Sequence, residues 1–279
     1  MSAQKEVFSS KLGMILSVLG IAVGTGNIWR FPRIAAQNGG EDGAGAFLIA
    51  WAVFLIMWSI PLIIAEYGIG RNGRKGGVQS FADLIGEKKG WMGGFVGFVA
   101  TAIMFYYSVV AGWCLYYLTQ AIFAPLPETA DQALGIWNNF QGSNWPILTH
   151  ATVMLLGGYI VLKGIKSIEK VNKILIPSLL VVLVISLGKA LTLEGSGIGI
   201  KYLFTPDWSD LTNPNLWLEA LTQNAWDTGA AWGLILTYAT YMRKQDDITI
   251  SAFQTGIGNN LVSITAAVII FSTVFGTLS

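Results

Sequence analysis

Stretches of apolar residues without a single charge alternate along this chain with short polar segments. No Asp, Glu, Lys or Arg occurs at positions 12–29, 43–65, 90–127 or 248–279. Each stretch meets or approaches the roughly 20 residues that an α-helix needs to cross the hydrocarbon core of a bilayer. Spanning strands would be shorter and would alternate in polarity. The pattern therefore predicts an all-α integral membrane protein.

Seven membrane-spanning segments are predicted from this pattern. They cover 12–36, 45–70, 91–124, 147–164, 167–193, 216–242 and 248–277. The third is longer than a bilayer is thick, so we expect it to tilt or to extend into solvent. The connections 125–146 and 194–215 contain Pro, Asp, Asn and Trp, which favours loops outside the membrane with short helical pieces.

Basic residues set the expected orientation. Of the 17 Lys and Arg residues, most fall on one side of the predicted spans. They are Lys5, Lys11, Arg71, Arg74, Lys75, Lys88, Lys89, Lys163, Lys166, Lys170, Lys173, Arg243 and Lys244. Because basic residues collect on the cytoplasmic side, we expect the N-terminus in the cytoplasm. Arg30 and Arg33 lie at the outer end of the first span against this bias, and either have a function there or snorkel to the headgroups.

Composition narrows the function classes further. Only 12% of the residues are charged, against about a quarter in a soluble domain. No short apolar segment with a small-residue cleavage site is present, so we expect no cleavable signal peptide. One cysteine, Cys114, and one histidine, His150, argue against a disulfide framework and against a His/Cys metal cluster. No acidic pair has catalytic spacing either, so we do not expect an enzyme. We also expect no nucleic-acid partner.

The first span contains residues that disfavour a continuous helix. Gly20 and Gly24 alone form a small-xxx-small motif, which is typical of close helix packing. Thr25, Gly26 and Asn27 follow directly, and all three are poor helix formers. We therefore expect an unwound segment, which a bilayer tolerates only where it is buried or lines a cavity. A dinucleotide fingerprint is excluded because no third glycine follows at the required spacing.

The predicted span 216–242 carries a similar interruption at Asn224, Asp227, Thr228 and Gly229. An Asp at the bilayer centre costs roughly 3 kcal/mol unless it is paired or binds a cation. We find no Lys or Arg at comparable depth in the sequence, so a cation site is favoured over a structural ion pair. Two interrupted spans at corresponding places in two halves indicate a transporter site. Residues 1–193 would form a first five-helix repeat, and 194–279 would begin an inverted second repeat with helices 6 and 7.

Several motifs resemble the neurotransmitter:sodium symporter family, in its bacterial amino-acid branch. They are GNIWRFP (26–32), NGG (38–40), GAFLIAW (45–51), IPLIIAEYGIGR (60–71), FYY (105–107) and LTYATYMRK (236–244). The resemblance implies a leucine-transporter-like inverted-repeat bundle with helices 1 and 6 unwound at mid-membrane. It also implies sodium-coupled symport of a small neutral or hydrophobic amino acid by alternating access, in the bacterial inner membrane.

The resemblance also implies roles for individual residues. The first sodium site would use the Ala22 carbonyl and the side chains of Asn27, Asp227 and Asn259; the second would use the carbonyls of Gly20 and Val23. Substrate would contact Ile21, Ala22, Gly24, Thr25, Gly26, Ile103, Tyr107, Trp226, Gly229 and Trp232. The amides near Thr25 and Gly26, with the Tyr107 hydroxyl, would hold its carboxylate. Arg30 would be the outer gate, Lys5 and Phe8 an inner latch, and Glu66 a brace for the unwound part of helix 6.

Four positions refine the expected substrate and ions. Gly24 replaces the Asp of monoamine carriers, which favours a zwitterion. Trp226 and Trp232 are bulkier than the usual Phe, and either pack, narrow the pocket or stack an aromatic substrate. Asp227 replaces the usual Thr or Ser. The positions expected near chloride are Trp51, Gln223, Asp227 and Ser263. We expect Asp227 to serve as a built-in anion, so that chloride is not required; alternatively, it pairs with the amine of a cationic substrate.

The chain departs from the family pattern in length. It ends after the predicted seventh helix, whereas the family fold has an eighth helix that completes the second sodium site. An acidic partner for Arg30 and the tenth helix are also missing. We therefore expect a truncated transporter whose C-terminal half is missing or is supplied by a second chain, including a second copy. The alternatives are a non-functional or partner-requiring fragment and a seven-helix receptor or sensor, which the cytoplasmic N-terminus disfavours.

Overall fold

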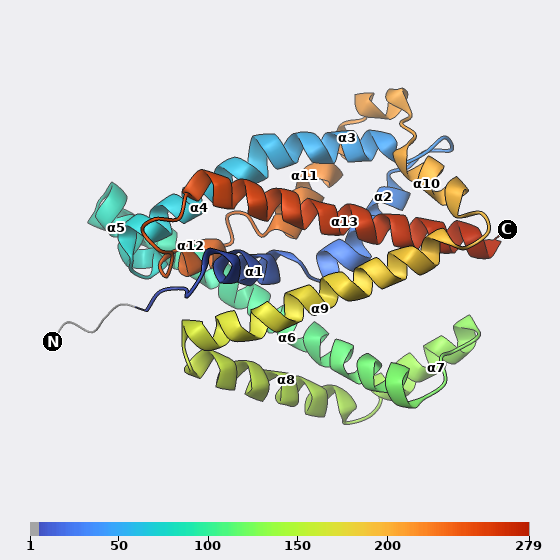
Figure 1. Cartoon of the computed structure of the whole chain (residues 1–279), viewed down its shortest axis with the longest axis horizontal. Coiled ribbons are helices and arrows are strands. Elements are labelled where there is room, and N and C mark those ends of the chain that lie inside the picture. Colours follow the sequence, from blue (N-terminus) through green and yellow to red (C-terminus); the bar gives the residue numbers. More distant parts are fainter. Residues whose placement is uncertain (1–5, 279) are drawn as a thin grey trace.

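The computed structural model describes residues 6–278, and these residues form helices and loops with no β-strand (Figure 1). The α-helices are α1 (Lys11–Ala22), α2 (Phe31–Gln37), α3 (Gly45–Phe54), α4 (Ile60–Gly73), α5 (Gly77–Ile85), α6 (Gly90–Phe123), α7 (Ala130–Gln141), α8 (Trp145–Leu162), α9 (Ile165–Leu191), α10 (Ser196–Phe204), α11 (Pro214–Thr228), α12 (Leu234–Ala239) and α13 (Ile248–Leu278). Two π-helical turns, η1 (Gly26–Arg30) and η2 (Leu55–Ser59), and two 3₁₀ turns, η3 (Glu87–Lys89) and η4 (Trp208–Thr212), join them.

Five helices in the described part are long and apolar enough to cross a membrane. They are Gly45–Gly73, Glu87–Phe123, Trp145–Leu162, Ile165–Leu191 and Ile248–Thr277. The predicted first span is a pair of helices, Lys11–Ala22 and Gly26–Gln37, bent by 56°. The predicted span 216–242 consists of α11 and α12, neither of which is long enough alone. A count of seven therefore depends on each broken pair crossing as one unit, and it stays a prediction.

Both interruptions lie where the sequence contains its weak helix formers. Helix α1 ends at Ala22, and Val23 is extended at φ −80° and ψ 114°. Helix α11 ends at Thr228, and the next residue, Gly229, has a φ of 61°. Ala231, with a φ of 69°, is one of two non-glycine residues in the left-handed region among those described. Such a conformation costs about 1–3 kcal/mol and persists only where the surroundings hold it. The second break is therefore fixed by tertiary contacts.

The connections contain the short helices that the sequence indicates. Helix α7 lies within 125–146, and α10 and η4 lie within 194–215. Helix α5 was not predicted; it packs against α4 and α6 between the second and third spans. The start of α1, α5, the α8–α9 turn and the α12–α13 loop lie at one end of the bundle, whereas α7, α10 and the C-terminus lie at the other (Figure 1). The first of these is called the basic end here, because the basic residues listed above surround those connections.

Two hydrophobic clusters hold the broken helices between the long ones. One contains Phe31, Phe47 and Trp51 and joins α2, α3, α10, α11 and α13. The other contains Phe8 and Tyr67 and joins the segment before α1 to α4, α12 and α13. Helices α6 and α8 instead keep most of their apolar side chains on the outside. This exposure suits helices that face lipid rather than water.

Candidate ion and substrate site at the two helix breaks

Asn27 joins the first helix break to α13. Its Oδ1 accepts a hydrogen bond from the amide of Gly24 at 2.9 Å. Its Nδ2 donates to Asn259 Oδ1 and to Ser263 Oγ, each at 2.8 Å. The side chains of Asn27, Asn259 and Ser263 are all fully buried. The sequence-predicted pair Asn27 and Asn259 therefore meets inside the bundle.

Asp227 lies in the same cluster and is 1% exposed. Its Oδ1 accepts from Gln223 Nε2 at 2.6 Å, and its Oδ2 accepts from Ser263 Oγ at 3.3 Å. A methyl group on Gly26 would lie 3.0 Å from Asp227 Oδ1, so the π-helical turn passes close to the carboxylate. Among the described residues, none of the ion pairs includes Asp227.

Amide, hydroxyl and carboxylate oxygens thus converge around one buried place. Such oxygen donors suit a hard cation, and unwound backbone adds carbonyls to the set. The described residues hold no group of three or more His, Cys, Asp or Glu side chains of the kind that binds a multivalent metal. A single carboxylate among neutral oxygens fits a monovalent ion such as sodium.

Arg30 reaches this cluster from the far side of Gln223. Its Nη1 donates to Gln223 Oε1, and its guanidinium lies 5.8 Å from the centroid of the Trp226 ring. The expectation that no basic side chain lies near the depth of Asp227 was wrong in this respect. One glutamine links the arginine to the carboxylate, although the sequence places Arg30 and Asp227 almost 200 residues apart.

Aromatic rings form a wall beside the breaks. The Tyr107 and Trp226 rings are stacked with centroids 6.3 Å apart, and Trp226 and Trp232 meet edge to face at 5.2 Å. Ile103 lies one helical turn before Tyr107 on α6 and is half-buried. A methyl group on Gly24 would meet no atom within 4 Å. No neighbouring residue therefore crowds Gly24 at the first break.

The remaining predicted substrate residues border the same region. A methyl group on Gly229 would lie 3.8 Å from the Trp232 ring and 4.0 Å from the Ile21 side chain. Thr25 interacts with the Tyr107 side chain. Ala22 is the last residue of α1 and is buried. The structure thus brings α1, α6 and the second break together here.

Fewer polar groups surround the residues of the predicted second sodium site in the described part of the chain. Val23 packs with Leu183 and Val262. Asn172 Oδ1 would lie 3.2 Å from a methyl group on Gly20. No carboxylate accompanies Gly20 and Val23 in the contacts of the described residues.

Glu66 lies against the second break. Its Oε2 accepts from the amide of Leu236 at 2.9 Å, and the amides of Ala231, Gly233 and Ile235 also interact with its carboxylate. These amides belong to the segment between α11 and α12 and to the first turn of α12, whose N–H groups have no partner within the helix. The carboxylate therefore satisfies donors that the break leaves free.

Ser59 is a structural residue that sequence reasoning missed. Its hydroxyl donates to Asn224 Oδ1 and receives a hydrogen bond from Thr228 Oγ1 at 3.0 Å. Asn224 Nδ2 in turn donates to the Trp51 carbonyl at 2.8 Å. The signal in the sequence was a lone serine inside an apolar run. The indole N–H of Trp51 is buried and has no acceptor among the described residues.

At the basic end, Phe8 is 1% exposed and packs on Tyr238 with ring centroids 5.9 Å apart. Its amide donates to the Tyr241 carbonyl at 3.0 Å. Lys5, the other half of the predicted latch, lies outside the described residues.

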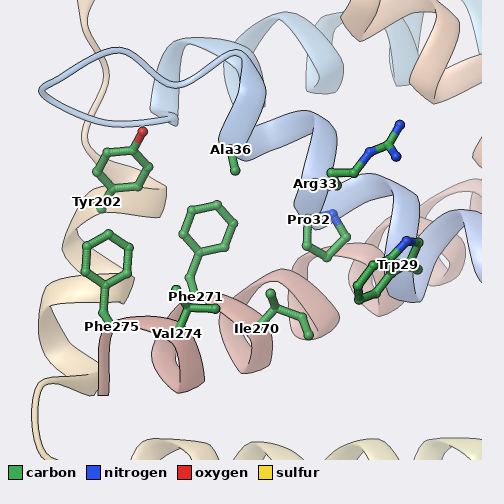
Figure 2. Close-up of a pocket in the computed structure, with 9 residues that line it drawn as sticks. All are labelled: Trp29, Pro32, Arg33, Ala36, Tyr202, Ile270, Phe271, Val274 and Phe275. Carbon is green, nitrogen blue, oxygen red and sulfur yellow. The ribbon is translucent and has the colours of Figure 1, made fainter. Parts of the chain in front are cut away.

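A pocket of about 340 Å³ lies away from this site, between α2, α10 and α13 (Figure 2). It is lined by Trp29, Pro32, Arg33, Ala36, Tyr202, Ile270, Phe271, Val274 and Phe275. The Tyr202 hydroxyl donates to the Gly40 carbonyl at 3.0 Å, and the Arg33 guanidinium points away from the aromatic rings in Figure 2. No predicted substrate residue lines this pocket, so it is not the predicted substrate site.

Comparison with known proteins identifies the family of the chain. The profile of the sodium:neurotransmitter symporter family matches residues 5–144 and 135–278. The uncharacterized sodium-dependent transporter MJ1319 of Methanocaldococcus jannaschii is 36% identical over 283 residues, with 97% of this chain and 56% of the relative covered. The sodium-dependent neutral amino acid transporter B(0)AT2 of Pongo abelii is 30% identical, with 96% of this chain and 40% of the relative covered.

A solved structure supports the fold. The crystal structure of MhsT in complex with L-phenylalanine superposes with a TM-score of 0.87 at 34% identity, covering 98% of this chain and 62% of that one. The chain thus spans between 40% and 62% of the length of these relatives. These matches confirm the expected family of sodium-dependent transporters, which are not enzymes. They also confirm the expected all-helical bundle with long apolar helices. The chain belongs to the sodium:neurotransmitter symporter family.

Proposed function

We propose that this chain provides the ion- and substrate-binding part of a sodium-coupled symporter for a small neutral or hydrophobic amino acid. The observation that carries the proposal is the buried set of oxygen atoms from Asn27, Asp227, Asn259 and Ser263. Two relatives support the substrate class: one is named a neutral amino acid transporter, and MhsT was solved with L-phenylalanine. The basic end would face the cytoplasm of the cell.

Both backbone and side-chain groups would bind ions and substrate at the proposed site. The Ala22 carbonyl and the oxygens of Asn27, Asn259 and Asp227 would hold the first sodium ion. Amides near Thr25 and Gly26, with the Tyr107 hydroxyl, would hold the substrate carboxylate. Gly20 and Val23 would contribute to a second sodium site that residues outside this chain complete. The full transporter would need a C-terminal half or a partner copy for this purpose.

Alternating access would use the two breaks as hinges. The 56° bend after α1 and the positive φ angles around Gly229 and Gly233 separate short helical halves from their neighbours. Hinges of this kind absorb rotation in a few residues while the packed helices stay rigid. Sodium and substrate bound at the breaks would couple the two halves.

Asp227 would replace chloride as the anion beside the first sodium ion. Gln223 and Ser263 already donate to its carboxylate. A buried fixed charge of this kind offsets the charge of the ion, so no mobile anion is needed. The competing role, binding the amine of a cationic substrate, would leave uptake independent of sodium.

Transport into membrane vesicles tests the proposal directly. Vesicles from cells that express the native gene should accumulate a labelled neutral amino acid when sodium, but not potassium, is outside. Accumulation should continue when gluconate replaces chloride. A matched vesicle preparation carrying Asn27→Ala should lose accumulation. Uptake that ignores sodium, or ligand binding without accumulation as in a receptor, would contradict the proposal.

A further inference from the structure

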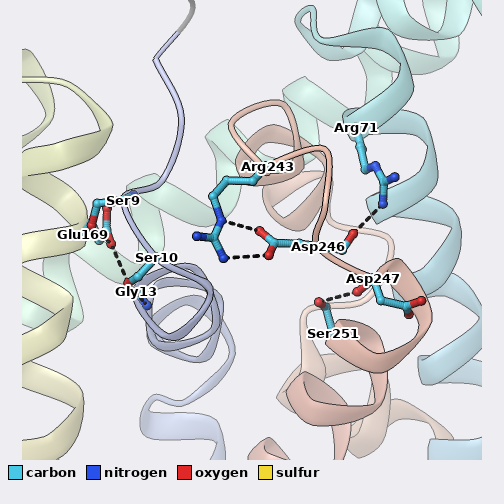
Figure 3. Close-up of polar contacts among 9 residues, drawn as sticks. All are labelled: Ser9, Ser10, Gly13, Arg71, Glu169, Arg243, Asp246, Asp247 and Ser251. Carbon is cyan, nitrogen blue, oxygen red and sulfur yellow. Dashed lines mark hydrogen bonds and ion pairs between the residues drawn. The ribbon is translucent and has the colours of Figure 1, made fainter.

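Glu169, on the first turns of α9, lies beside Ser9 and Ser10 at the basic end (Figure 3). Its side chain is 2% exposed. Its Oε2 accepts from the amide of Ser9 at 2.7 Å, and its Oε1 accepts from Ser9 Oγ at 2.6 Å and from Ser10 Oγ at 3.2 Å. Lys173 Nζ lies 2.7 Å from Oε1. Three of these four contacts come from the two residues that precede α1.

These contacts fasten the start of α1 in particular. Ser10 is the N-cap of α1, and its Oγ accepts from the Gly13 amide at 3.0 Å while it donates to Glu169. A methyl group on Gly13 would collide with the Glu169 carboxylate, so only glycine allows this approach. A carboxylate at a helix N-terminus also interacts favourably with the helix dipole. Glu169 thus stabilises both the cap and the first turn of α1.

Two further contacts tie the same segment in place. Glu6 Oε2 accepts from the Ile165 amide at 3.3 Å, at the first turn of α9. Phe8 is buried against Tyr238, and its amide donates to Tyr241. The segment is therefore held by α9 on one side and by α12 on the other.

Helix α1 is a short element that a bend of 56° separates from the helix that follows it. It has 12 residues and is separated from η1 and α2 by the extended Val23 and by Gly24. If α1 swings on this hinge, Ser9 and Ser10 must leave Glu169. The carboxylate would then keep only Lys173 in a buried setting, which is costly because hydrogen bonds to a charged group are strong.

We propose that Glu169 is a positioning residue that clamps α1 in its closed position, and that the basic end opens when Ser9 and Ser10 leave its carboxylate. The clamp rests on the proposed transport function, because it sets which side of the site is open. It acts through α1 and does not itself touch the ion cluster.

Thiol labelling at Ser17 reads the position of α1. The Ser17 hydroxyl is fully buried, has no partner among the described residues and faces a cavity of about 220 Å³ between α1, α8, α9 and α12. The reporter is Ser17→Cys with Cys114→Ser, which removes the natural cysteine. The reagent is a small charged methanethiosulfonate applied to the side of the membrane that the basic end faces.

Glu169→Gln should raise the labelling rate about tenfold or more, because a neutral amide weakens the contacts to Ser9 and Ser10. Ser9→Ala, which keeps the carboxylate and the backbone contact, should give a smaller increase. Lys170→Gln, an exposed neighbour on α9, should label at the parental rate. Glu169→Asp should restore part of the slow rate.

The outcomes separate the clamp from the proposed function. Sodium should slow labelling of the parent, and an unchanged rate with sodium would contradict ion coupling but not the clamp. A sodium effect in the parent together with parental rates in Glu169→Gln and Ser9→Ala would overturn the clamp. If Glu169→Gln does not fold, Ser9→Ala decides the test alone.

Discussion

Replacing Asp227 should make transport depend on chloride. Asp227→Ser removes a buried carboxylate that accepts hydrogen bonds from Gln223 and Ser263. Both donors then lack their acceptor, and the buried Trp51 indole N–H already lacks one among the described residues. Helix α3, which carries Trp51, packs against α11, which carries position 227. We expect a chloride ion to take the place of the missing charge beside Gln223 and Ser263.

The magnitude follows from the burial of the carboxylate. Opposite unit charges about 4 Å apart attract by roughly 4 kcal/mol at an effective dielectric constant of 20. Asp227 is 1% exposed, so water screens it little. Part of this attraction is offset by the cost of burying the carboxylate. We expect the sodium concentration for half-maximal uptake to rise roughly 10- to 100-fold in chloride-free buffer, since about 1.4 kcal/mol corresponds to tenfold.

The assay is sodium-dependent uptake in chloride and in gluconate. The parent should give equal rates in both, and Asp227→Ser should recover in chloride alone. Asp227→Asn has a side chain of the same size without the charge and leaves no room for a chloride ion. Its uptake should therefore stay impaired in both buffers. Asp83→Asn, which removes an exposed carboxylate paired with Lys75, serves as the control. A chloride requirement in the parent, or full activity of Asp227→Ser without chloride, would refute the reasoning.

Three other predictions concern the breaks. Trp232→Phe should raise uptake of larger substrates relative to smaller ones about tenfold in a competition assay. The reason is that a smaller ring would then lie edge to face on Trp226 and leave more room for the substrate. Unchanged selectivity would argue for a packing role alone. Gly26→Ala should weaken sodium-dependent uptake, since the methyl group would press on Asp227 and Trp226, whereas Gly24→Ala should leave thermal stability unchanged because its methyl group meets nothing within 4 Å. Glu66→Gln should lower stability by about 2 kcal/mol in detergent melts, because a neutral amide oxygen accepts the hydrogen bond from the Leu236 amide more weakly than a carboxylate does. An unchanged melting temperature would remove its role as a brace.

The exposed ion pair between Asp83 and Lys75 should contribute little to the dependence of fold stability on pH. Hydrogen bonds from Lys75 and Gln79 lower the pKa of the Asp83 carboxyl. Such a group stabilises the fold above its unfolded pKa, and this contribution is lost as the pH falls through the lowered value. Because Asp83 is fully exposed, water screens the interaction, and Asp83→Asn should leave acid melting curves almost unchanged.

Local composition alone predicts the long apolar helices, and its weak helix formers lie where α1 and α11 end. Charge-free stretches predict spans because a bilayer tolerates few charges, and Gly24, Gly26 and Gly229 predict breaks because glycine and its polar neighbours are poor helix formers. The resemblance to the family predicted roles for individual positions, with Asn27, Asp227 and Asn259 as ion ligands. The structure places these three side chains in one hydrogen-bonded cluster, and their role as ligands stays a prediction.

Other features required the packed chain. The link from Arg30 through Gln223 to Asp227, the partners of Ser59 and the clamp at Glu169 join residues that lie about 160 to 200 positions apart. No local pattern marks such pairs, because their proximity depends on how whole helices cross. The positive φ of Ala231 has the same origin, since alanine adopts it only where surrounding contacts offset the strain. The sequence determined which segments are apolar and where they break, whereas tertiary packing decided which buried polar groups meet, because each must find its partner on another helix.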